Sequence, residues 1–223
     1  PYSDPVMDGP IIQQAVDVAL AAGTTTPDVL RTVEAVAQTG APTLVMSYWN
    51  PILRYGPERF ARDLAAAGGA GAITPDLIPD EAEEWLAAAR HADIDTVFLV
   101  APSSTDDRLA LTAEASRGFI YAASTMGVTG TRDKVSGAAE ALVARLRRVT
   151  QLPIAVGLGV SNRDQAAEVA GFADGVIVGS AFVRRMIEAP ESATAASGVA
   201  TLAAELAEGV RRGSGLREPT NDA

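Results

Sequence analysis

Short apolar segments alternate with amphipathic helical segments along almost the whole chain, and this alternation restricts the possible folds more than any other feature. Six apolar segments are expected to be strands: 43–48, 71–74, 96–100, 119–122, 154–157 and 175–178. They recur at intervals of about 25–30 residues, as repeated strand–helix units do. Strands that are apolar throughout and alternate with helices indicate a parallel sheet covered by helices.

The intervening segments carry apolar residues at helical spacing and common helix start and stop signals. Helices are expected at 11–21, 27–39, 57–67, 79–90, 106–115, 136–149, 162–170, 181–187 and 199–211. Thr26 is predicted to cap the second helix, with Pro27 at its first position. Ser104 or Thr105 is predicted to cap the helix at 106–115.

A doubly wound sheet and a barrel both fit this alternation. The barrel is favoured because the strands are short and evenly spaced, and because polar or glycine-rich residues follow nearly every strand. We find no composition shift or linker that divides residues 1–223, so a single (β/α) barrel domain is predicted. Six strands are two fewer than a (β/α)8 barrel requires, and an open arc would leave two bare edges.

Composition excludes several classes of function. The 223 residues contain no Cys and a single His, His91, which rules out disulfides, thiolate nucleophiles and multi-histidine metal sites. A net charge of −10 disfavours binding to nucleic acids or anionic membranes. The apolar runs are too short for a transmembrane helix, and the first residues do not form a secretory signal. These features fit a cytoplasmic protein.

Glycine-rich turns follow the last two expected strands. Gly157-Leu-Gly159-Val-Ser161 and Gly179-Ser180 each lie between a strand and a helix, where backbone N–H groups and the helix N-terminus can hold a phosphate. The alternative is that these glycines only permit tight turns. Gly127-Val-Thr-Gly130 is either an irregular connection or a lid over a ligand.

The first residues form a stiff loop with three prolines and two acids, Asp4 and Asp8. These carboxylates could serve acid–base catalysis, be solvated, or, for Asp8, cap the helix that begins near Pro10. Asp76 could cap a helix or contact a partner. Five residues on separate strands are either ordinary core or the wall of an apolar pocket: Met46, Tyr48, Ile73, Leu99 and Tyr121.

Several of these motifs together resemble the tryptophan synthase alpha chain family. The most specific are Pro1-Tyr-Ser-Asp-Pro-Val-Met-Asp-Gly-Pro-Ile-Ile-Gln13 and Gly127-Val-Thr-Gly130. The similarity continues, in order, through Met46-Ser-Tyr-Trp-Asn-Pro51, Pro75-Asp-Leu-Ile-Pro79, Gly157-Leu-Gly159-Val-Ser161 and Val178-Gly-Ser-Ala181. The resemblance implies a (β/α)8 TIM barrel that cleaves indole-3-glycerol phosphate to indole and glyceraldehyde 3-phosphate by a retro-aldol reaction.

The resemblance also assigns roles to matching positions. Asp8 corresponds to the catalytic aspartate that accepts the indole N–H, and Thr129 to the lid threonine that orients it. Tyr48 and Tyr121 match pocket positions, with Met46, Ile73 and Leu99 as the apolar wall. The positions that match the phosphate site are Gly130, Gly159, Gly179 and Ser180. Those that match the interface with the partner are Asp4, Asn50 and Asp76.

The implied partner is the tryptophan synthase beta chain in an alpha2beta2 heterotetramer, which receives the indole and uses pyridoxal phosphate. The alpha chain itself is expected to need no cofactor. In this family a second catalytic acid, a glutamate, precedes the position of Pro1, together with the first strand, first helix and second strand. We therefore expect the native gene product to begin upstream of Pro1, and a polypeptide of these residues alone to have little lyase activity.

Two other functions remain open at this point. A different phosphate-binding barrel, such as a phosphosugar isomerase, would keep the glycine loops but would not need the proline-rich acidic loop. A non-catalytic activator of the beta chain would need Asp4, Asn50 and Asp76 but not Asp8.

Overall fold

The computed structural model describes residues 8–123 and 132–215. It contains two compact units. The first comprises Pro1–Val100, Ser104–Ile120 and Val149–Leu152; the second comprises Ala101–Ser103, Tyr121–Arg148 and Pro153–Ala223. The single domain expected from the sequence stays a prediction.

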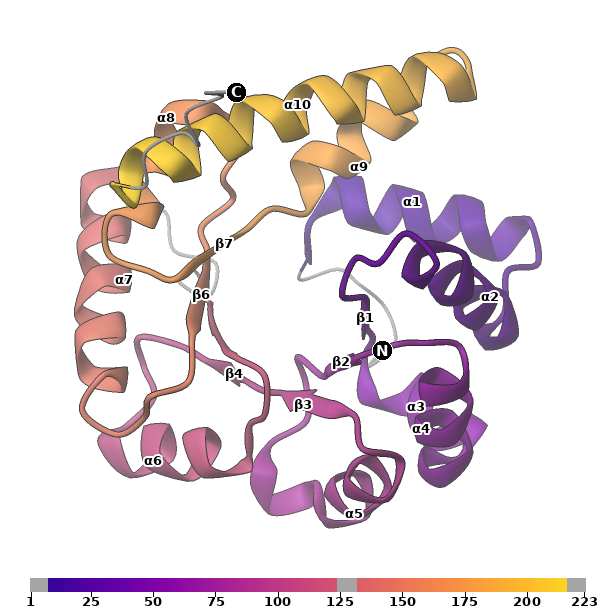
Figure 1. The fold of residues 1–223 in the computed structure, drawn as a ribbon, viewed down its shortest axis with the longest axis horizontal. Coiled ribbons are helices and arrows are strands. Elements are labelled where there is room, and N and C mark those ends of the chain that lie inside the picture. The colour runs from indigo at the N-terminus through magenta and orange to yellow at the C-terminus, as the bar shows by residue number, and fades with distance from the viewer. Residues whose placement is uncertain (1–7, 124–131, 216–223) are drawn as a thin grey trace, which may run out of the picture. The chain divides into compact units, whose positions relative to one another are not determined.

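A parallel three-stranded sheet forms the centre of the first unit (Figure 1). Its strands, in order, are β1 (Leu44–Met46), β2 (Gly71–Ile73) and β3 (Asp95–Val97). Met46 is level with Ile73, and Ile73 with Val97, so the carboxyl ends of all three strands lie at the same edge. The predicted strand at 96–100 is interrupted at Phe98, and β4 (Leu99–Val100) follows it.

This unit also contains helices and one 3-10 turn. They are α1 (Pro10–Ala21), α2 (Thr26–Ala37), α3 (Trp49–Tyr55), α4 (Pro57–Ala66), η2 (Pro79–Glu81), α5 (Glu83–Ala92) and α6 (Asp106–Ala115), of which α1 and α2 precede β1. Helix α3 was not predicted. The predicted helix at 79–90 is wrong at its start, because a 3-10 turn precedes α5. Thr105 caps α6 by accepting the Arg108 N–H at 3.3 Å, as one of the two predicted alternatives.

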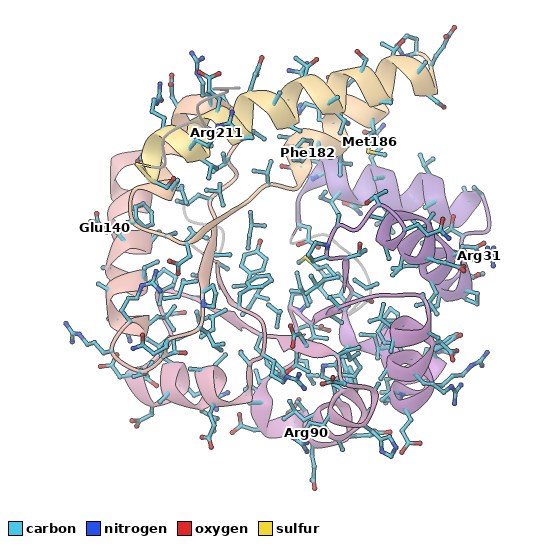
Figure 2. The ribbon with its side chains drawn as sticks, viewed as in Figure 1. Arg31, Arg90, Glu140, Phe182, Met186 and Arg211 are labelled. Carbon is cyan, nitrogen blue, oxygen red and sulfur yellow. The ribbon has the colours of Figure 1, made fainter. Side chains whose placement is uncertain are left out.

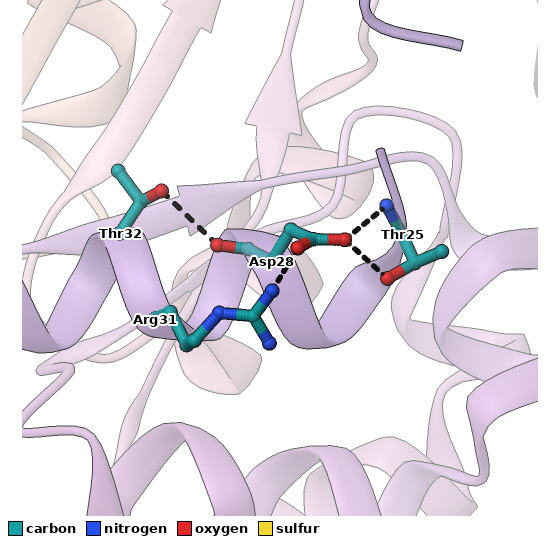
Figure 3. Close-up of polar contacts among 4 residues, drawn as sticks. All are labelled: Thr25, Asp28, Arg31 and Thr32. Carbon is teal, nitrogen blue, oxygen red and sulfur yellow. Dashed lines mark hydrogen bonds and ion pairs between the residues drawn. The ribbon is translucent and has the colours of Figure 1, made fainter. Parts of the chain in front are cut away.

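The N-terminus of α2 corrects a second prediction. Thr25, rather than Thr26, is the N-cap residue, and it forms a capping box with Asp28. The Asp28 carboxylate accepts the Thr25 backbone N–H at 2.8 Å and also pairs with Arg31 (Figure 3). The Thr32 hydroxyl donates to the Asp28 carbonyl at 3.0 Å (Figure 3). The bond from Thr25 is the main cause of a lowered pKa for Asp28.

An aromatic core joins α4 and α5 behind the first sheet. The rings of Phe60 and Trp85 lie 6.0 Å apart, and both side chains are fully buried. Burying side chains of this size contributes about 2–3 kcal/mol each. Two buried polar atoms among the described residues have no hydrogen-bond partner: Thr74 Oγ1 and Trp85 Nε1.

The second unit contains β5 (Ile120–Ala123), β6 (Ile154–Gly157) and β7 (Gly175–Ile177) as hydrogen-bonded neighbours in that order. Strands β6 and β7 are parallel, with Gly157 level with Ile177. Its helices are α7 (Arg132–Leu146), α8 (Arg163–Ala170), α9 (Ser180–Ile187) and α10 (Ser192–Gly213). The predicted helix at 199–211 therefore begins too late, and the one predicted at 136–149 begins four residues after the true start.

Helices α8 and α10 lie side by side with almost no side-chain volume between them (Figure 1). A Cβ atom at Gly209 would overlap the Arg163 carbonyl oxygen, and one at Gly213 would overlap that of Ala167. Two ion pairs flank this contact: Arg163 with Glu208 at 3.0 Å, and Arg212 with Asp164 at 2.6 Å.

Candidate active site

The carboxyl edge of the first sheet presents the turn that carries Tyr48. Ser47, directly after β1, donates its backbone N–H to the Ile73 carbonyl at 3.1 Å and so extends the pairing of β1 with β2. Helix α3 begins one residue after Tyr48. Only Ser47 and Tyr48 separate the strand from the helix, which fixes the position of the tyrosine.

The Tyr48 hydroxyl donates a hydrogen bond to Asp8 Oδ2 at 2.7 Å, across 40 positions of sequence. Asp8 is exposed and immediately precedes Gly9, the N-cap residue of α1. No side chain caps α1, so the interpretation of Asp8 as a helix cap is wrong. Gly9 has φ +94°, a backbone conformation that favours glycine. The structure thus brings together two predicted site residues, with the carboxylate open to solvent.

Two of the predicted interface residues, Asp76 and Asn50, lie at the start of α3. Asp76 Oδ1 accepts the backbone N–H of Trp49 at 2.8 Å. Asp76 therefore caps α3, a helix that begins 27 positions before it in the sequence. Burial raises the pKa of Asp76, and the N–H bond from Trp49 offsets only part of this effect. Asn50 is half-buried in the first turn of the same helix.

The three residues of the predicted apolar wall lie on strands of the first unit. Met46 and Ile73 are paired in register at the ends of β1 and β2. Met46 is 48% exposed and Ile73 is half-buried, so both can meet a ligand at this edge. Leu99, in β4, is also half-buried.

In the second unit, Tyr121 on β5 packs directly against Gly157 at the end of β6. A Cβ atom at Gly157 would lie 2.6 Å from the tyrosine oxygen and 2.8 Å from a ring carbon. The glycine therefore provides the space for the half-buried ring. Sequence reasoning noted Gly157 only as part of a phosphate loop and missed this role.

The two predicted phosphate loops emerge from paired parallel strands, β6 and β7. Gly159 has φ +65° and Gly179 is the N-cap residue of α9, which begins at Ser180. A Cβ atom added at Gly159 or at Gly179 would have no neighbouring atom within 4 Å. Open backbone near a helix N-terminus suits an anion.

One donor of the first loop is already used. Gln165 Oε1 accepts the backbone N–H of Ser161 at 2.7 Å and its hydroxyl at 3.1 Å. Asn162 caps α8 by accepting the Gln165 N–H at 3.0 Å. The loop is thereby tied to the helix that follows it.

Three predicted site residues, Asp4, Thr129 and Gly130, lie outside the described residues. A separate groove in the second unit contains none of the predicted site residues. Met186 of α9 borders it, 59% exposed, and Figure 2 shows this side chain near Phe182 on the same helix. The other residues that line the groove are Ala189, Pro190, Glu191, Ser192, Ala195, Ala196 and Val199.

Within the described part of the chain, no group of three His, Cys, Asp or Glu residues is arranged to hold a metal ion. No helix of residues 8–123 and 132–215 has the length and apolarity needed to cross a membrane.

The model of the family described as "Tryptophan synthase alpha chain" matches residues 1–211. The chain belongs to the tryptophan synthase alpha chain family. It is 66% identical to the tryptophan synthase alpha chain of Thermobifida fusca, over 95% of this chain and 79% of that protein. It is 62% identical to the alpha chain of Acidothermus cellulolyticus, over the same shares.

Solved structures agree with this assignment. A tryptophan synthase structure from Mycobacterium tuberculosis has a TM-score of 0.85 and 56% identity, over 95% of this chain and 79% of that one. The alpha subunit from Legionella pneumophila has a TM-score of 0.79 and 30% identity, over 96% of this chain and 79% of that one. The predicted fold class, that of the (β/α)8 barrel of tryptophan synthase alpha chains, is confirmed.

Membership also confirms the predicted enzyme class. Tryptophan synthase alpha chains are indole-3-glycerol-phosphate lyases of tryptophan biosynthesis, and this chain is one of them. In this family the pyridoxal phosphate belongs to the beta chain. Tryptophan biosynthesis by this family is cytoplasmic, as predicted.

Proposed function

We propose that Asp8 polarises the indole ring of indole-3-glycerol phosphate during its cleavage. Its carboxylate accepts the indole N–H and stabilises the tautomer protonated at C3. In that tautomer the C3–C3′ bond breaks as the C3′ hydroxyl loses its proton and becomes the aldehyde of glyceraldehyde 3-phosphate. The observation that supports this role most directly is the 2.7 Å bond from the Tyr48 hydroxyl to Asp8, which orients the carboxylate at the edge of the sheet.

Asp8 Oδ2 accepts the Tyr48 hydroxyl, and we assign the other carboxylate oxygen to the indole N–H. A flat apolar ring suits a surface made by Met46, Ile73 and Leu99. Tyr121 is assigned to the substrate by the family resemblance alone. Thr129 is proposed to orient Asp8, as the family motif implies.

The phosphate of the substrate is proposed to bind the backbone of the two glycine loops. Gly159 and Gly179 have open space beside their backbone, Gly179 and Ser180 lie at the N-terminus of α9, and Gly130 is assigned by the motif. Binding through the backbone anchors the substrate without a basic side chain.

The indole is proposed to pass to a tryptophan synthase beta chain in an alpha2beta2 complex. Asp4, Asn50 and Asp76 are the proposed contacts with this partner. The Mycobacterium tuberculosis relatives in the solved structures are tryptophan synthases, two of them in aminoacrylate-bound forms.

A polypeptide made only of residues 1–223 is proposed to cleave the substrate poorly. Asp8 can polarise the indole, but a second acid–base group must accept the hydroxyl proton and supply the proton to C3. The family resemblance places that group before Pro1. Cleavage by this polypeptide at the rate of a full-length homologue would contradict the proposal.

The test of Asp8 is the Asp8→Asn variant, made in the chain as its gene encodes it. Indole release should fall at least about 100-fold, because general acid–base groups contribute on this scale. Asp17→Asn, an exposed acid on α1, is the control and should keep full activity. Activation of the beta chain should survive both changes. Normal indole release by Asp8→Asn would contradict the role of Asp8. Activation of the beta chain without any indole release by the parent would support a non-catalytic activator, and turnover of phosphoribosyl compounds a phosphosugar isomerase.

A further inference from the structure

Asp76 makes a contact that its place at a partner interface does not require. Its Oδ1 accepts the Trp49 N–H at 2.8 Å, which is the first N–H of α3. The N-cap position of α3 is Tyr48, and no side-chain cap comes from that residue. The donor at the start of the helix is therefore satisfied by a residue from the loop after β2.

The same contact restrains Tyr48. On one side of the tyrosine, Ser47 donates its N–H to Ile73 at 3.1 Å. On the other side, Trp49 donates to Asp76. The peptide groups flanking Tyr48 are thus attached to β2 and to the loop that follows β2.

Beyond this anchored backbone, the Tyr48 hydroxyl reaches Asp8 Oδ2 at 2.7 Å. A chain of contacts therefore runs from Asp76 through the Trp49 N–H to Tyr48 and on to Asp8. Each step is a hydrogen bond or a covalent link within one residue or its neighbour.

We propose that Asp76 is a positioning residue for the lyase reaction, which holds the backbone of Tyr48 and through it the carboxylate of Asp8. This inference depends on the proposed function of Asp8. It differs from a partner contact in what it requires of Asp76: an oxygen acceptor at this place rather than a negative charge.

Three variants in the full chain separate the two requirements. Asp76→Ala removes the acceptor and the charge, Asp76→Asn keeps an amide oxygen but removes the charge, and Asp80→Asn is a charge-matched control nearby. Asp80 is exposed and pairs with Arg108 at 2.7 Å, away from α3.

We expect kcat for indole release to fall about tenfold in Asp76→Ala, the scale of a lost helix cap, with KM changed less than about twofold. Asp76→Asn should recover to within about threefold of the parent, and Asp80→Asn should match the parent. Equal losses in Asp76→Ala and Asp76→Asn would overturn the proposal in favour of a role for the charge.

The route through Tyr48 is tested by a double-mutant cycle. In a Tyr48→Phe background, Asp76→Ala should change kcat less than about threefold, because the hydroxyl that transmits the effect is gone. An undiminished tenfold loss would overturn the proposal. If Asp76→Ala does not fold, as judged by its thermal melt, Asp76→Ser takes its place in the cycle.

The Asp8→Asn variant separates the proposed role of Asp8 from the positioning role of Asp76. If it retains activity, the proposed function fails and the positioning role fails with it. If it loses activity while Asp76→Ala keeps the kcat of the parent, only the positioning role is overturned.

Discussion

Gly157 and Tyr121 are in direct contact across two neighbouring strands, and no side chain larger than hydrogen fits between them. A Cβ at position 157 would lie 2.6 Å from the Tyr121 oxygen and 3.0 Å from the carbon that bears it. The pair connects the end of β6, where a phosphate loop begins, with a residue of the proposed pocket.

Gly157→Ala should therefore displace Tyr121 and destabilise the fold. Overpacking of this kind costs about 1–3 kcal/mol, which thermal unfolding would detect. Activity should fall as well, because both the pocket and the loop move. The second-site change Tyr121→Leu should restore the melting temperature of Gly157→Ala. Gly137→Ala is the control, since position 137 on α7 has open space, and it should not lower the melting temperature.

The proposed phosphate site predicts a specific effect of charge at α9. Ser180→Glu places a carboxylate at the first position of the helix, where it interacts favourably with the helix dipole but repels a phosphate. The KM for indole-3-glycerol phosphate should rise at least about tenfold without loss of thermal stability. Inhibition by inorganic phosphate should weaken in parallel. Ser192→Glu, at the first position of α10, should leave KM unchanged.

The contact between α8 and α10 depends on two glycines. Gly209→Ala should destabilise the protein by at least about 2 kcal/mol, because its Cβ would overlap the backbone of Arg163. Gly198→Ala in the same helix is the matched control. The atom nearest to a Cβ added at Gly198 would be 4.0 Å away, so alanine fits there. Because alanine favours a helix more than glycine does, the change should stabilise α10 by up to about 1 kcal/mol. Urea unfolding of both variants measures the difference.

The contacts of Asp174 predict that the folded protein loses stability in acid. Burial acts to raise its pKa, but the Ile154 N–H at 2.8 Å and the ion pair with Arg147 outweigh it, so the pKa is lowered. A carboxyl whose pKa is lower in the folded protein than in the unfolded protein stabilises the fold at every pH above its unfolded pKa, which is about 4. This contribution disappears as the pH falls through the pKa of the folded state.

Asp174→Asn should accordingly be less stable than the parent at pH 7 by less than about 1 kcal/mol, since the carboxylate side chain is 41% exposed and screened by water. The difference should vanish near pH 2. Urea unfolding at both pH values measures it, with Glu205→Gln on α10 as the exposed control. An equal deficit at both pH values would show that the charge does not contribute.

Local sequence patterns were enough to predict the strands. Segments such as Ile154–Gly157 are apolar, short and bounded by proline or glycine, and the structure confirms them to within one or two residues, except that 96–100 is divided at Phe98. The cap of α2 was also readable, because Thr25 and Asp28 have the spacing of a capping box. The error of one residue arose from three consecutive threonines.

Contacts between distant segments were not predictable in the same way. Helix α3 contains Pro51 and is only seven residues long, and the residue that caps it is 27 positions away. The start of α10 at Ser192 lies in a run of small residues with weak helix signals. The bond between Asp8 and Tyr48 spans 40 positions, so the motif could name both residues but not their contact.

Helices α8 and α10 meet backbone to backbone at Gly209 and Gly213, without a layer of rotatable side chains to absorb motion. Helix α8 is in turn tied to its preceding glycine loop through Gln165 and Ser161. The loop, α8 and α10 therefore form a stiff mechanical linkage. We expect that a displacement of the loop, such as the proposed phosphate would cause, moves the 22-residue helix α10 as well, because few side chains can rearrange to absorb it.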